Sequence, residues 1–269
     1  MRPLVMGVVN VTPDSFSDGG VWFEPGAAIA RGRDLLAQGA DIIDVGGEST
    51  RPGALRPSVE EELDRTIPVV ESLVGLGAVV SIDTMRATVA AAALDAGASM
   101  VNDVSGGLAD PDMPGLVAER HVDIVAMHWR GHAVDMQTRA VYGDVVAEVR
   151  AELEGRITAL VGAGVDERRI ILDPGFGFAK TAEHNWTLLK HLDRLTGLGH
   201  RVLAGTSRKA FLGRVGRDAG HERLPLQRDV ATAVTNAYAT LAGVWAVRVH
   251  DVPSTLDAID VARAIEAAP

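Results

Sequence analysis

Near its start the chain carries the apolar run LVMGVVN, at residues 4–10. Seven later runs share its make-up, which is nearly continuous Val, Ile, Leu and Ala with polar residues toward the end. They are DIIDVGG (41–47), AVVSIDT (78–84), MVNDVSG (100–106), DIVAMHW (123–129), RIILDPG (169–175), RVLAGTS (201–207) and WAVRVHD (245–251). Near-continuous apolar runs are typical of parallel strands that are covered on both faces. The sequence therefore predicts eight parallel strands.

Stretches with helical spacing separate these runs. The clearest is SVEEELDRTIPVVESL (58–73), where Ser58 stands three residues before Glu61, the pattern of a capping box. The other predicted helices are PGAAIARGRDLLAQGA (25–40), MRATVAAAALDAGA (85–98), VVAEVRAELEGRITALVGAG (145–164) and a segment at about 229–242. Strands that alternate with helices fit three architectures: a closed (β/α)8 barrel, an open doubly wound sheet, or two smaller α/β domains.

The count of eight strands and the absence of a linker favour the barrel. We predict an α/β fold, a (β/α)8 TIM barrel, with residues 1–269 as a single domain. No G-x-G-x-x-G sequence follows the first run, which weakens the open, dinucleotide-binding sheet. The longest irregular piece, GRVGRDAGHERLPLQRD at 213–229, is interpreted as an insertion before the helix at about 229–242.

The composition argues against several classes of protein. The formal net charge of −10 disfavours a nucleic-acid surface, which needs a basic face. The chain has no cysteine, which excludes disulfides and thiolate metal sites and fits a reducing cytoplasm. It has neither a leader pattern nor an apolar stretch near the roughly 20 residues that span a bilayer. We therefore expect a cytoplasmic protein with no nucleic-acid or membrane partner.

Polar side chains gather where the predicted strands end. They are Asn10, Asp44, Glu48, Asp83, Asn102, Asp103, His128, Asp173, Ser207, Arg248, His250 and Asp251. In a (β/α)8 barrel these strand ends converge on one rim, where the active site is built. The convergence, rather than any single residue, predicts a site.

Several of these residues also have a purely local interpretation. Asp44 and Asp103 are candidates for helix caps, and Asp173 before Pro-Gly is a candidate for an Asx turn. A lone His128 at a strand end is more often structural than a ligand. No histidine pair, and no histidine with a carboxylate, has the spacing of a zinc site.

A basic cluster follows the last two predicted strands, in TSRKAFLG (206–213) and RVHD (248–251). Phosphate sites of these barrels often lie there. Lys209, Arg248 and His250 are suited to hold a diphosphate through charge-assisted hydrogen bonds. An unpaired Arg248 inside an apolar strand would be costly, which favours a functional role for it.

Seven segments together resemble dihydropteroate synthase, a family of the folate pathway. They are GVVNVTPDSFSDGG, DVGGESTRPGA, SIDT, NDVSGG, DPGFGFAKT, GTSRK and RVHD, in the family's order from Gly7 to Asp251. The resemblance implies an enzyme that condenses a dihydropterin diphosphate with p-aminobenzoate to give 7,8-dihydropteroate and diphosphate. It also makes sulfonamides candidate inhibitors, with Ala210 leaving the sensitivity open, and it implies a homodimer formed through late helices.

The resemblance assigns a role to each matching position. Pterin contacts map onto Asp83, Asn102, Asp173 and Lys209, with Met127 and Phe178 against the ring. Two carboxylates, an amide and a lysine complement the N–H donors and the carbonyl of a pterin edge. The diphosphate maps onto Asn10, Arg248 and His250, with Thr50 nearby. A Mg²⁺ on Asn10 is implied as cofactor, because that ion prefers hard oxygen ligands.

The implied reaction is a dissociative substitution at the pterin methylene, with Asp83, Lys209, Arg248 and His250 as catalytic residues. Diphosphate leaves, Asp83 favours the delocalised cation, and the arylamine attacks without a covalent enzyme intermediate. Phe16, Arg51 and Pro52 match the p-aminobenzoate pocket of two loops, although Phe16 is also a candidate packing anchor. Ala210 stands where many family members have Ser.

Two rival functions stay open at this point. A pterin-binding methyltransferase acting on a corrinoid shares the barrel and the Asp/Asn set, but needs neither the basic cluster nor the STRPG pocket. A pterin-binding paralogue without activity is the second rival. For the synthase, Lys209→Ala and Arg248→Ala are expected to fold nearly normally and to lose orders of magnitude in turnover.

Overall fold

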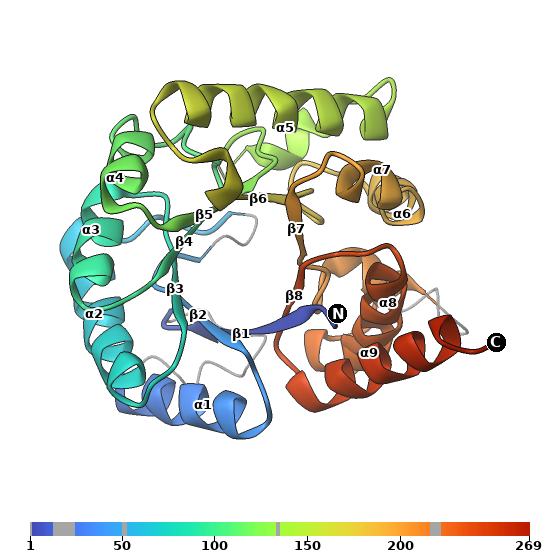
Figure 1. Cartoon of the computed structure of the whole chain (residues 1–269), viewed down its shortest axis with the longest axis horizontal. Helices are drawn as coiled ribbons and strands as arrows, with labels where there is room; N and C mark the ends of the chain where they lie inside the picture. Colours follow the sequence, from blue (N-terminus) through green and yellow to red (C-terminus); the bar gives the residue numbers. More distant parts are fainter. Residues whose placement is uncertain (1, 13–24, 50–52, 133–134, 216–221) are drawn as a thin grey trace.

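The computed structural model describes residues 2–12, 25–49, 53–132, 135–215 and 222–269. Eight parallel strands close into a barrel in chain order, with β8 paired to β1 (Figure 1). The strands are β1 Leu4–Asn10, β2 Ile42–Gly46, β3 Val80–Asp83, β4 Met100–Asp103, β5 Asp123–Met127, β6 Ile170–Asp173, β7 Arg201–Ala204 and β8 Ala246–Val249. The predicted (β/α)8 barrel is confirmed, and the pairing of the last strand with the first excludes the open sheet.

Helices surround this ring, and α8 and α9 pack side by side next to β8 (Figure 1). The helices are α1 Pro25–Ala37, α2 Val59–Gly75, α3 Ala87–Asp95, α4 Met113–Arg120, α5 Val145–Gly162, α6 Ala182–Lys190, α7 Asp193–Thr196, α8 Asp229–Leu241 and α9 Val252–Glu266. Short 3₁₀ turns lie at Met136–Arg139, Glu167–Arg169, Ala210–Arg214 and Pro225–Arg228. No helix in the described ranges combines the length and the apolar character needed to cross a bilayer.

Local sequence signals explain where several elements begin and end. Ser58 caps α2 as predicted: its hydroxyl accepts the N–H of Glu61, and the Glu61 carboxylate accepts the N–H of Ser58 at 2.9 Å. The first predicted strand matches β1, whereas the run 201–207 overshoots β7, because the chain leaves the sheet at Gly205.

The core lies in two layers, one between strands and helices and one inside the barrel. The apolar residues of the inner layer are all buried, and they are Met6, Ile42, Met100, Val125, Ile171, Leu203 and Ala246. Side chains alternate along a strand, so the next inward positions toward the carboxyl ends include Asp44, Asn102, Asp173 and Arg248. The sheet register pairs Asp83 with Asn102 and Met127 with Asp173 at that level. The strand ends therefore deliver polar groups to one mouth.

Candidate active site

A cavity of about 640 Å³ opens at the carboxyl ends of the strands. The predicted site residues that line it are Asn10, Asp83, Asn102, Met127, Asp173, Phe178, Lys209, Arg248 and His250. The structure thus brings together residues that span most of the chain. Phe16, Thr50, Arg51 and Pro52 lie outside the described residues.

Arg248 holds the floor of the cavity together. Its Nε donates to Oδ2 of Asp44 at 2.6 Å, and its Nη2 donates to Oδ2 of Asp83 at 2.7 Å. The Asn102 amide donates to the same Asp44 oxygen at 2.9 Å. Asp44 is completely buried in β2, so it orients Arg248 and Asn102 and does not cap a helix.

Burial affects the pKa values of the two cavity carboxylates, Asp83 and Asp173, in the same direction. Burial raises the pKa of Asp83 to about 7, and the neighbouring charge of Asp44 adds to this rise while Arg248 opposes it. Burial also raises the pKa of Asp173. Oδ1 of Asp173 accepts the N–H of Gly175 at 2.7 Å, so the Asx-turn interpretation is correct and the same side chain still lines the cavity.

Lys209 and Phe178 form one wall. The Lys209 Nζ lies 4.1 Å from the centre of the Phe178 ring, close enough for a cation–π contact. Burial, with help from Arg248, lowers the pKa of Lys209 to about 8. A Cβ on Gly177 would come within 3.0 Å of the Lys209 side chain, so glycine makes room for the lysine stem.

His250 enters the site as a neutral ring. Burial and the charge of Arg208 lower the pKa of His250 well below its ordinary value. Ser207 Oγ accepts the backbone N–H of His250 at 3.1 Å and lies 2.9 Å from Nδ1 of the ring. With the hydroxyl donating to Nδ1, Nε2 keeps its proton and serves as a donor.

Arg208, for which the sequence pattern indicates no role, positions the loop after β7. Its Nε and Nη2 donate to the two carboxylate oxygens of Asp229 at 2.7 and 2.8 Å, a bidentate ion pair with the first residue of α8. The backbone of Arg208 is left-handed, with φ 57°. This ion pair fixes the segment from which Lys209 projects.

A buried ion pair that the sequence pattern does not signal anchors the segment after β2. Glu62 is completely buried and accepts from Nη1 of Arg86 at 2.8 Å. Nη2 of Arg86 donates to the carbonyl of Pro57 at 2.6 Å. The residue types alone indicate an exposed helix face for Glu62, because only the fold brings Arg86 to it.

The described residues contain no group of three His, Cys, Asp or Glu side chains arranged around a metal position. Asn10 lines the cavity, half-buried at the end of β1, and offers one amide oxygen. Mg²⁺ is commonly held by one or two protein oxygens together with substrate phosphates. A single hard oxygen at a cavity for a diphosphate therefore fits that ion.

Known proteins match this chain along nearly all of its length. A family model described as pterin binding enzyme matches residues 6–250. A dihydropteroate synthase of Mycobacterium leprae (strain TN) is 53% identical over 263 residues, which are 97% of this chain and 92% of that protein. The chain belongs to the dihydropteroate synthase family of pterin-binding enzymes. As a synthase of this family it is a transferase of folate biosynthesis.

Solved structures of the synthase family share the fold. The Xanthomonas albilineans synthase with 4-aminobenzoic acid is 48% identical, with a TM-score of 0.91 over 100% of this chain and 94% of that one. The Yersinia pestis synthase in a sulfonamide drug complex is 37% identical, with a TM-score of 0.93 over 99% and 95% of the two chains. A further Xanthomonas albilineans structure holds 7,8-dihydropteroate, at 45% identity and a TM-score of 0.87 over 100% and 95%.

Proposed function

We propose that the cavity binds a dihydropterin diphosphate on its floor and p-aminobenzoate nearer the mouth. The observation that carries this proposal is that Asp83, Asn102, Asp173 and Lys209 line one cavity. These groups complement the donors and the carbonyl of a pterin edge. Support comes from the relatives, whose solved structures contain 4-aminobenzoic acid and 7,8-dihydropteroate.

In the proposed reaction, the diphosphate leaves the pterin methylene before the amine attacks. Lys209, Arg248 and the Nε2–H of His250 receive the departing charge, and Asn10 would hold Mg²⁺. Bound there, Mg²⁺ supplies charge neutralisation to the leaving group. Asp83 lies beside the pterin and favours the delocalised cation. Thr50, Phe16, Arg51 and Pro52 keep the roles that the resemblance implies, as proposals.

A direct assay with purified protein tests the proposal. Mixing dihydropterin diphosphate, p-aminobenzoate and Mg²⁺ is expected to yield dihydropteroate and diphosphate in equal amounts. A chelator is expected to slow turnover and leave the fold unchanged by circular dichroism. Pterin binding without diphosphate release would favour the inactive paralogue, and methyl transfer from a methylfolate to a corrinoid would favour the methyltransferase.

We also propose that the chain, 1–269, works as one domain, in the cytoplasm, and as a homodimer. The exposed residues Val230, Val234, Tyr238 and Leu241 support the dimer, since their spacing places them on one face of α8. The absence of cysteine supports a reducing compartment.

A further inference from the structure

The loop between β6 and α6 has an unusual backbone. Gly175, Gly177 and Ala179 all have positive φ, at 69°, 79° and 47°. Glycine adopts this region readily, but an alanine there is strained, so contacts must hold it. The loop carries Phe178, the ring that forms one wall of the cavity under Lys209.

The Lys180 side chain forms hydrogen bonds to two backbone carbonyls of this loop. Its side chain is 4% exposed, and Nζ donates to the carbonyls of Gly175 and Phe178, each at 3.1 Å. The third contact of Nζ is Nδ1 of His128, at 2.9 Å. An ammonium has three N–H donors, and here it meets three acceptors.

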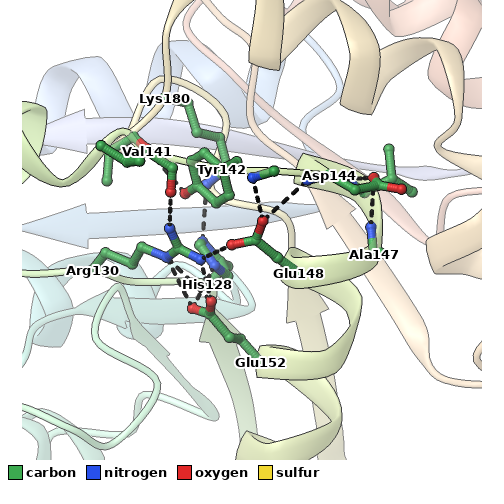
Figure 2. A network of polar contacts seen from close by, with 12 residues as sticks. His128, Arg130, Val141, Tyr142, Asp144, Ala147, Glu148, Glu152 and Lys180 are labelled. Atoms are coloured by element: carbon green, nitrogen blue, oxygen red, sulfur yellow. Dashed lines mark hydrogen bonds and ion pairs between the residues drawn. The ribbon is translucent and has the colours of Figure 1, made fainter.

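His128, Glu152 and Arg130 form a chain of polar contacts that holds Lys180 in place (Figure 2). Because Nδ1 of His128 accepts from Lys180, Nε2 carries the proton and donates to Glu152 at 3.0 Å. Burial, with the charge of Lys180, lowers the pKa of His128 to about 4, which agrees with a neutral ring. Arg130 in turn binds Glu152 through Nη2 and Nε.

The same network reaches the last strained residue of the loop. The guanidinium carbon of Arg130 lies 3.9 Å from the centre of the Tyr142 ring, and the Tyr142 hydroxyl donates to the carbonyl of Ala179 at 3.0 Å. Gly177 is held separately, since its N–H donates to the buried Asn185 at 2.7 Å. Figure 2 shows how Tyr142, Arg130, His128 and Lys180 converge.

We propose that Lys180 is a positioning residue for the pterin, which acts by fixing the loop that carries Phe178 and is itself oriented by His128 and Glu152. Lys180 also places a positive charge near Asp173, which favours the ionised carboxylate that accepts pterin N–H groups. Burial lowers the pKa of Lys180 to about 7, and the charge of Asp173 opposes this fall. The proposal rests on the synthase reaction.

The test compares two variants. Lys180→Met keeps an unbranched side chain of similar length and removes the ammonium, and Lys190→Met is the matched change at an exposed lysine of α6. For Lys180→Met we expect the Kd of a pterin analogue, measured by calorimetry, to rise about tenfold or more, because a displaced wall misplaces the ring. The KM for p-aminobenzoate should stay within about twofold of wild type. Lys190→Met should leave both values unchanged.

Two results would overturn the proposal: pterin binding within about twofold of wild type in folded Lys180→Met, or equal weakening of both substrates. If Lys180→Met does not fold, Glu152→Gln decides, because Glu152 is partly exposed and the variant keeps its shape. It should raise the pterin Kd about two- to fivefold with an unchanged KM for p-aminobenzoate, and no change would reject the proposal. Wild-type turnover, measured in parallel, reports on the synthase reaction independently.

Discussion

Arg248 has both a binding and a structural role. It pairs with Asp44 and Asp83 on the cavity floor, whereas Lys209 lies over an aromatic ring. Removing one partner of a buried ion pair leaves an uncompensated charge, which is strongly destabilising. The structure therefore revises the expectation that Arg248→Ala folds nearly normally, and retains that expectation for Lys209→Ala.

We predict that Arg248→Ala lowers the free energy of unfolding by about 3 kcal/mol at pH 7. Lys209→Ala should lower it by less than about 1 kcal/mol, because the cost of burying the Lys209 charge offsets its contact with the Phe178 ring and its attraction to Asp173. Both variants should lose most of their turnover. Urea unfolding of the two variants beside wild type measures the difference, and equal stabilities would contradict the structural role of Arg248.

The pH profile of the reaction should reflect two groups of the site. Pterin binding needs Asp83 as a carboxylate, and its pKa is raised to about 7, so kcat/KM for the pterin substrate should rise through that pH. Lys209 has a pKa lowered to about 8, so kcat/KM should fall as that charge is lost. We predict a bell-shaped profile between these values.

Lys209→Arg isolates the alkaline limb. A guanidinium stays charged throughout this range, so the fall above pH 8 should move upward by more than about one unit while the acid limb stays in place. Initial rates at saturating p-aminobenzoate measure both limbs. If the alkaline limb is unchanged in Lys209→Arg, the deprotonation of Lys209 does not cause the fall of kcat/KM at alkaline pH.

At the scale of the element, the loop after β6 depends on close backbone approach. A Cβ on Gly175 would lie 2.5 Å from the carbonyl oxygen of His128, at φ 69°. Gly199 also has a positive φ, 84°, but a Cβ there would meet no atom within 4 Å. A substitution by alanine would therefore strain the left-handed backbone at both glycines, but it would cause a steric clash only at Gly175.

We predict that Gly175→Ala weakens pterin binding by about tenfold or more, because the loop that carries Phe178 must shift. Gly199→Ala should cost about 1 kcal/mol of stability from the left-handed backbone and leave pterin binding unchanged. Thermal unfolding and calorimetric titration of both variants measure the two effects. Similar pterin affinities for the two variants would contradict this prediction, because the clash at Gly175 would then be relieved without a shift of Phe178.

The elements that the sequence predicts well are those with a local cause. Apolar runs predict the strands, and the Ser58 capping box predicts the start of α2, because both depend on neighbouring residues. The network of His128, Glu152 and Lys180 has no such signal. His128 directly follows β5, Glu152 lies in α5 and Lys180 lies in the loop between β6 and α6, so only the packing of this β5–α5–β6 unit brings them together.

The candidate site follows the same division. Convergence of strand ends predicts that Asp83, Asp173, Lys209 and Arg248 share one mouth, and the cavity contains all four. The pattern does not predict that Asp44 binds Arg248, because a carboxylate after an apolar run fits a cap equally well. The choice between these roles depends on a partner 204 positions away.

At the scale of the whole molecule, the site depends on closure of the ring. β8 carries Arg248 and pairs with β1, whose last residue is Asn10, and both side chains line the same cavity. The inner apolar layer below them keeps the polar floor at the carboxyl end. The basic cluster and the carboxylates therefore share one mouth, as a synthase requires.

The outer surface of the barrel leads to the last prediction, which concerns the oligomer. Val234 on α8 is 66% exposed, within the apolar face that also includes Val230, Tyr238 and Leu241. Exposed apolar faces of this kind commonly mark contacts between proteins. We predict that the wild-type protein in solution has twice the chain mass of 28.3 kDa.

A charge in the centre of that face should separate the subunits. Val234→Glu places a carboxylate where the partner's apolar face would bury it, at a cost of several kcal/mol per interface. Val161→Glu, at an exposed valine of α5, is the matched control and should keep the wild-type mass. Light scattering after size exclusion measures all three proteins. If Val234→Glu keeps the doubled mass while folding normally, the subunits meet through another face and α8 is not the contact.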